Sequence, residues 1–217
     1  MWKPFLLPVA LALLAPIALR AQATQTKPLD IYFLDTEGGQ ATLFVAPSGQ
    51  SMLVDTGFPG NQGMPGTSAP GITRDADRIT TVLKLANVTV LDYVVVTHYH
   101  GDHAGNAAEL ASRIPIRHFI DHGPYTVELQ PNRSGAFVSY QPVREKAHAI
   151  TAKPGDRIPI AGLDVQVASS AGALITKPME GAPGAGGRAI GEREGRHGFH
   201  VRGRTPSGLV PRAHRSG

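Results

Sequence analysis

The sequence contains no cysteine and few aromatic residues: one tryptophan, five tyrosines and seven phenylalanines among 217 residues. The absence of cysteine excludes disulfide bonds, so the fold must depend on a hydrophobic core or on a bound metal. The chain is 41% hydrophobic and 18% charged, which is typical of a globular protein. Its length fits one domain of ordinary size.

Most of the chain also lacks an excess of positive charge, although the formal net charge is +4. Residues 181–217 contain seven arginines and two glutamates, a balance of +5. Residues 1–180 contain 14 basic and 15 acidic side chains, a balance of −1. The larger part of the chain therefore has no basic stripe for a phosphate backbone, and its composition does not predict nucleic-acid binding.

The longest apolar segment is short for a membrane span. It runs from residue 5 to residue 19, follows Lys3, contains two prolines and precedes Ala21-Gln22-Ala23. Roughly 15 apolar residues fall short of the ~20 that cross a bilayer, although a membrane anchor is the alternative interpretation. The pattern predicts a secretory signal peptide over residues 1–23, cleaved after Ala23. We therefore expect a periplasmic or secreted protein with no membrane segment after cleavage.

Apolar patterns predict a mixed α/β domain over residues 24–180. We expect strands at 30–35, 41–46, 51–55, 92–97 and 116–120, helices at 75–86, 104–112 and 137–149, and a hairpin at 153–170. The segment 92–97 is almost continuously apolar, which is typical of a strand buried on both faces. Strands followed by an alternation of strand and helix fit a layered α/β domain.

Residues 181–217 have a different composition, with ten glycines, one aromatic residue and no lysine. Such a segment cannot bury enough apolar surface to offset its chain entropy, so we predict a disordered tail rich in arginine and glycine. The same composition is typical of a GC-rich gene translated out of frame, and a natural disordered tail is the alternative. The histidines of this tail lack strand context, and we do not expect them to be metal ligands.

The strongest functional signal is "THYHGDHAGN" at residues 97–106. Alternate residues on a strand share a face, so His98 and His100 can point the same way, and a glycine permits a turn before Asp102 and His103. Imidazole and carboxylate groups are zinc ligands. Four ligands from six residues cannot surround one tetrahedral ion without strain. We therefore expect two Zn²⁺ ions, one held by the first pair and one by the second.

This segment resembles the H-x-H-x-D-H motif of the metallo-β-lactamase superfamily. Residues 31–57, "IYFLDTEGGQATLFVAPSGQSMLVDTG", resemble the opening of that fold, closest to the hydrolase domain of ComEC-type competence proteins, and the likeness covers about residues 29–175. The resemblance implies an αββα sandwich. It also implies that Asp55 supports the metal site from beneath and is not a ligand.

The resemblance further implies a zinc-dependent hydrolase, and the predicted signal peptide implies that it is secreted. In it a hydroxide on the two zinc ions attacks an ester, amide or phosphodiester bond, and Asp102 also orients that hydroxide. The expected substrate is a small molecule or a nucleotide-type compound.

The later part of the family's pattern is not found in this sequence. Members of the superfamily draw further ligands from the second half of the domain: a histidine, a bridging aspartate and another histidine. In the competence-type branch the last two lie in "GD" and "HHG" segments, and neither segment follows Ser170. We therefore expect only the N-terminal part of the sandwich, in a chain truncated at its C-terminal end. The domain contains three other histidines, His118, His122 and His148. Of these, His122 could line the cleft. The alternative function is a non-catalytic fragment that binds metal weakly or not at all.

Overall fold

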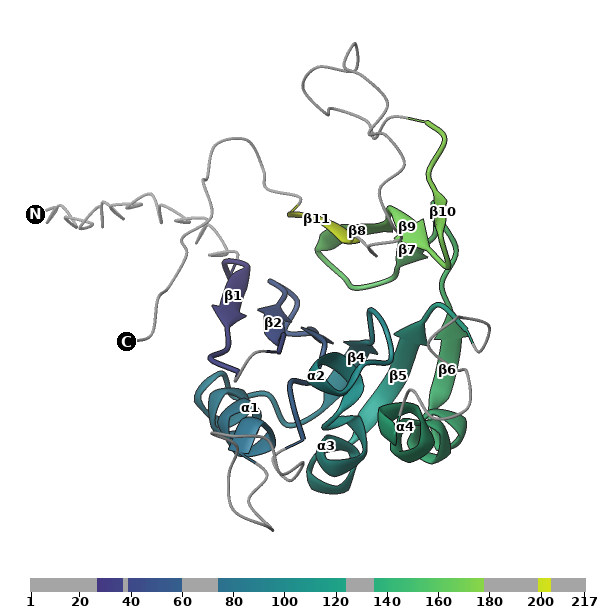
Figure 1. Cartoon of the computed structure of the whole chain (residues 1–217). Coiled ribbons are helices and arrows are strands. Elements are labelled where there is room, and N and C mark those ends of the chain that lie inside the picture. Colours follow the sequence, from purple (N-terminus) through teal and green to yellow (C-terminus); the bar gives the residue numbers. More distant parts are fainter. Residues whose placement is uncertain (1–26, 37–38, 60–73, 124–134, 178–198, 204–217) are drawn as a thin grey trace, which may run out of the picture.

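The protein is described by a computed structural model over residues 27–36, 39–59, 74–123, 135–177 and 199–203 (Figure 1). The expected signal peptide and most of the expected tail lie outside these residues. Within the described ranges, no helix combines the length and the apolar character needed to cross a membrane.

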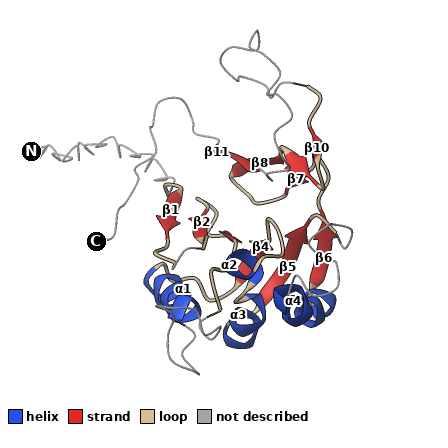
Figure 2. Ribbon diagram, in the orientation of Figure 1, coloured by secondary structure: helices blue, strands red, loops and turns tan. Residues whose placement is uncertain are grey.

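The described elements form three layers: helices, a six-stranded sheet and a small sheet (Figures 1 and 2). The large sheet consists, in spatial order, of β1 (Asp30–Phe33), β2 (Thr42–Val45), β3 (Ser51–Val54), β4 (Leu91–Val95), β5 (Ile116–Asp121) and β6 (His148–Thr151). The first three strands form an antiparallel meander, and β3 to β6 run parallel. The parallel strands have carboxyl ends at a common edge.

Helices cover one face of this sheet, and short strands cover the other. The helices are α1 (Arg74–Leu85), α2 (Gly101–Ala104), α3 (Ala107–Arg113) and α4 (Gly135–Lys146). The short strands are β7 (Arg157–Ile158), β8 (Leu163–Val167), β9 (Ser169–Ser170), β10 (Ala173–Leu174) and β11 (Phe199–Gly203). The small sheet has the antiparallel order β11-β8-β7, and β9 pairs with β10.

Strand β4 lies in the middle of the core because both of its faces are covered. Val94 packs into the apolar cluster that includes the helices, and Val95 packs into the cluster that includes the small sheet. All five residues of β4 are buried. This confirms the prediction of a strand buried on both faces.

Helix α1 forms where the apolar spacing predicts it. Ala76, Ile79 and Leu83 are buried against the sheet. The first turn carries two aspartates and the last turn carries a lysine, and both charges complement the helix dipole.

Three predicted segments differ in the structure. The helix expected at 104–112 is divided into α2 and α3, because the Asn106 side chain donates to backbone oxygens of another loop. The helix expected at 137–149 ends at Lys146, and residues 148–151 form β6. Within the expected disordered tail, residues 199–203 form β11, because their backbone pairs with the edge of β8.

Candidate metal centre

The predicted metal-binding cluster begins directly after β4, at the carboxyl end of a central parallel strand. This edge is where open α/β sheets bind their ligands. One possible ligand atom from each of His98, His100 and Asp102 lies within 4.8 Å of the others. His98 and Asp102 are half-buried, whereas His100 is exposed. Two imidazoles and a carboxylate are a donor set that fits zinc, and one side of the cluster faces solvent.

His103 lies against the same cluster but has a different environment. Its ring centroid is 3.9 Å from that of His98. Its Nε2 is 3.5 Å from Oδ2 of Asp102, and its Nδ1 is 2.8 Å from Oδ2 of Asp55. The structure thus brings the four predicted ligands together. It groups Asp102 with the two preceding histidines, whereas the sequence suggested a separate pair of Asp102 and His103.

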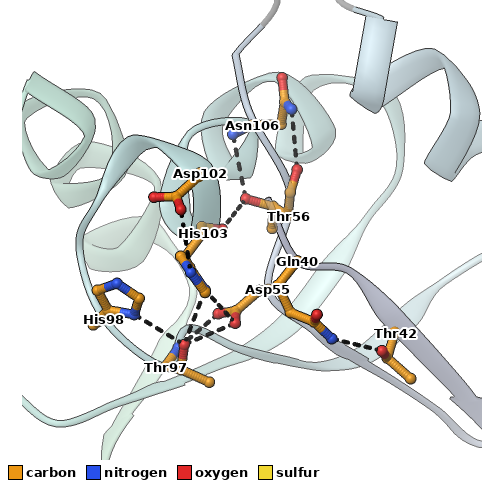
Figure 3. A network of polar contacts seen from close by, with 9 residues as sticks. All are labelled: Gln40, Thr42, Asp55, Thr56, Thr97, His98, Asp102, His103 and Asn106. Atoms are coloured by element: carbon orange, nitrogen blue, oxygen red, sulfur yellow. Dashed lines mark hydrogen bonds and ion pairs between the residues drawn. The ribbon is translucent and has the colours of Figure 1, made fainter. Parts of the chain in front are cut away.

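Asp55 lies beneath the cluster, 1% exposed, and its carboxylate connects two strand ends (Figure 3). Oδ1 accepts a hydrogen bond from the backbone nitrogen of Thr97 at 2.8 Å, and Oδ2 accepts one from the Thr97 hydroxyl at 2.7 Å. Oδ2 also contacts His103. The φ angle of Asp55 is +59°, a conformation unfavourable for most residues, which aspartate tolerates better than most.

The loop after β3 holds α2 in place through its backbone. Both the backbone nitrogen and the hydroxyl of Thr56 donate to the carbonyl of His103, each at 2.7 Å. The Asn106 amide donates to the carbonyls of Thr56 and Phe58, at 3.0 and 2.7 Å. The roles of Thr56 and Asn106 have no local sequence signal, because their partners are about 50 positions away.

A second loop, between β1 and β2, closes on the same short helix. The backbone nitrogen of Gln40 donates to the carbonyl of Asp102 at 3.1 Å. A Cβ atom at Gly39 would overlap that carbonyl, so this approach requires glycine. Gly39, the second glycine of the "EGGQ" turn, therefore allows the loop to pack directly against the backbone of Asp102, a candidate ligand.

Tyr99, between the first two histidines, anchors this part of the loop in the core. Its side chain is fully buried, and its hydroxyl donates to the carbonyl of Gly123 at 2.9 Å. Its ring packs against His122, with centroids 4.4 Å apart. His122 therefore packs under the loop and is not in the group of three possible ligands.

The other two histidines of the domain also lie apart from that group. His118 and His148 face each other on β5 and β6, with ring centroids 5.6 Å apart, and His118 stacks on Tyr93. Within the described residues, His98, His100 and Asp102 form the only group of three or more potential ligands.

A buried ion pair supports the neighbouring end of β5. The carboxylate of Asp121 accepts hydrogen bonds from the Tyr140 hydroxyl at 2.7 Å and from Arg144 at 2.5 and 3.1 Å. Burial, with the charge of Asp121, raises the pKa of Tyr140 far above its usual range, so the phenol stays protonated. The hydrogen bond to Asp121 likewise raises the pKa of Arg144.

A sequence model of the metallo-beta-lactamase superfamily matches residues 35–210. The chain belongs to the metallo-beta-lactamase superfamily. The match includes every candidate ligand and also β11. It agrees with the expected α/β fold, of which the described residues contain one helical layer, a six-stranded sheet and two small sheets.

Several solved structures resemble the chain at low identity. A metallo-beta-lactamase with a HARLDQ motif from Cronobacter sakazakii is 16% identical, with a TM-score of 0.41, over 65% of this chain and 53% of that one. The metallo-beta-lactamase fold protein YhfI from Bacillus subtilis gives the same identity and TM-score, over 65% and 52%. CmlA, a diiron beta-hydroxylase from Streptomyces venezuelae, is 15% identical with a TM-score of 0.38, over 65% and 24%.

The chain thus spans about half the length of the first two structures. A search of curated proteins gives no match.

Proposed function

We propose that this superfamily member is a secreted, zinc-dependent hydrolase that acts on an ester, amide or phosphodiester bond. The observation that carries the proposal is the convergence of His98, His100 and Asp102 within 4.8 Å at the carboxyl end of β4. We assign these three residues as ligands of one zinc ion. A second ion would use His103 together with Asp102, whose Oδ2 is 3.5 Å from Nε2 of His103.

Zinc, when bound, activates a water molecule for attack at neutral pH, so the chain needs no strong base of its own. The two histidines would hold the ion just after β4. The half-buried Asp102 carboxylate would accept a hydrogen bond from a water molecule at the site and orient it toward the substrate. Asp55 orients the imidazole of His103 through its Nδ1 and does not bind metal.

The substrate that we propose is a small phosphodiester or a nucleotide-type compound. The likeness of residues 31–57 to the ComEC-type branch favours this class over lactams. Residues 1–180 carry a balance of −1, so long nucleic acids would find no basic track on this part of the chain.

A non-catalytic, weakly metal-binding role is the second candidate. One observation supports this candidate. The described residues bring together only one group of three potential ligands, whereas the resemblance implies two ions. An ion held by few ligands is poorly placed, and a misplacement of ~1 Å can lower the rate on the order of 10²-fold.

Hydrolysis by the zinc-loaded whole chain separates the two candidates. We expect turnover of bis(p-nitrophenyl) phosphate to exceed turnover of nitrocefin, and Asp102→Asn to lower it on the order of 10²-fold, because the water loses its orienting carboxylate. Initial rates across zinc concentrations give this comparison. His148→Ala is the matched control, since it removes an exposed histidine outside the cluster. Weak zinc binding without turnover of either compound would contradict the hydrolase and favour the second candidate.

Export is a separate part of the proposal. We expect the mature protein to begin at Thr24, because Ala21-Gln22-Ala23 has the small-residue form that signal peptidase cleaves. Intact-mass measurement on protein secreted by the native host checks this. A chain that retains residues 1–23 in the membrane fraction would show that the segment is an anchor.

A further inference from the structure

The hydroxyl of Thr97 is the centre of the polar network under the cluster (Figure 3). Its Oγ1 is 2.7 Å from Oδ2 of Asp55, 3.2 Å from Nδ1 of His98 and 3.3 Å from Nδ1 of His103. One hydroxyl therefore contacts two imidazoles and the carboxylate beneath them. Through this hydroxyl, His98 in the first half of the H-x-H-x-D-H motif and His103 in its second half are both connected to Asp55, directly after β3.

The number of available protons decides the direction of these hydrogen bonds. A hydroxyl has one proton to donate, and an ionised carboxylate can only accept. The shortest contact of the hydroxyl is to Asp55, so its proton lies there. The oxygen then presents lone pairs to His98, and the hydrogen bond between them needs a proton on Nδ1 of that imidazole.

The same argument applies to His103. Its Nδ1 is 2.8 Å from Oδ2 of Asp55, which is closer than its 3.3 Å contact with the hydroxyl. A carboxylate at this distance requires a proton on Nδ1. Both imidazoles are therefore Nδ1–H tautomers, and the lone pair of each is on Nε2, the nitrogen turned away from Asp55 and Thr97.

We propose that Thr97 is a positioning residue that fixes the Nδ1–H tautomer and the ring orientation of His98. Two contacts hold the hydroxyl itself, because Asp55 binds both the backbone nitrogen and the side chain of Thr97. Asp55 thus orients His103 directly and His98 through the threonine. The metal-binding part of this inference rests on the proposed function, in which His98 is a zinc ligand.

Replacement of the hydroxyl by a methyl group tests the proposal at the metal. Thr97→Val keeps the side-chain shape and the backbone nitrogen, and we expect it to weaken zinc binding about 10- to 100-fold, as for other residues that orient a ligand. Thr97→Ser keeps the hydroxyl and is expected to retain wild-type affinity. Thr81→Val is the matched control, because that hydroxyl binds a helix carbonyl away from the cluster. Competition with a chromophoric chelator measures all four affinities in the whole chain.

Nitrogen NMR of the metal-free chain tests the tautomer without any metal. We expect long-range ¹H–¹⁵N correlations to show His98 as Nδ1–H in the wild type and as a mixture of tautomers in Thr97→Val. An Nε2–H tautomer in the wild type, or equal zinc affinity in the folded valine variant and the wild type, would overturn the proposal. If the wild type binds no zinc, the proposed function fails. In that case, and also if Thr97→Val does not fold, the His98 tautomer measured in the wild type still tests the role proposed for Thr97.

Discussion

Replacing both His98 and His100 by alanine is expected to abolish zinc retention. The two imidazoles supply two of the three donors that converge within 4.8 Å, and the remaining pair of Asp102 and His103 offers fewer protein ligands than a zinc site usually has. Changing a residue that only supports a ligand costs 10–100-fold in metal affinity, so loss of two direct donors should cost more than about 100-fold. Metal analysis by mass spectrometry after dialysis against a weak chelator measures the zinc content per chain.

The matched control removes two histidines that lie in the large sheet, away from the cluster. His118→Ala/His148→Ala deletes a neighbouring pair on β5 and β6 whose ring centroids are 5.6 Å apart. Because these histidines are outside the group of possible ligands, this variant should retain zinc like the wild type. Equal zinc content in the His98/His100 variant and the wild type would show that the cluster is not the metal site.

The parts of the fold that the sequence predicts well are those with a strong local pattern. Strand β4 is apolar except for Asp92, and α1 repeats Ala76, Ile79 and Leu83 at helical spacing. Strand β6 has no such pattern, because all four of its residues are exposed at the edge of the sheet. Strand β11 pairs through its backbone, and backbone hydrogen bonds leave little trace in residue types. Neither strand could therefore be predicted from the pattern of residue types.

The candidate site shows the same division between local and long-range information. The ligand set was visible because four metal-binding side chains occur within six residues. The resemblance pointed to Asp55 as a support of the site, but not to its contact with Thr97, 42 positions away, nor to the contact of Thr56 with Asn106, 50 positions away. Only the folded sheet brings the ends of β3 and β4 together. The candidate ligands could thus be picked out from the sequence, whereas their mutual orientation needed the structure.

Loss of the Asp121 carboxylate is expected to cause the largest fall in stability. Its side chain is fully buried and accepts hydrogen bonds from Arg144, Tyr140 and the backbone of Gly123. Asp121→Ala would leave a largely buried guanidinium and a buried phenol without their acceptor. Breaking a buried ion pair by removing one partner costs about 3–5 kcal/mol in the free energy of unfolding. Urea denaturation followed by circular dichroism measures this difference.

A surface pair provides the control for this measurement. Glu109→Ala removes a carboxylate that is 2.7 Å from Nε of Arg113 and 39% exposed, and such pairs contribute about 0–1 kcal/mol. The buried pair should also affect the metal centre, because Gly123, two residues after Asp121, accepts the hydrogen bond of Tyr99 between the two histidines. We therefore expect Asp121→Ala to weaken zinc binding even under conditions where the variant is folded. A loss of stability no larger than that of Glu109→Ala would show that the Arg144 pair does not hold this end of the sheet.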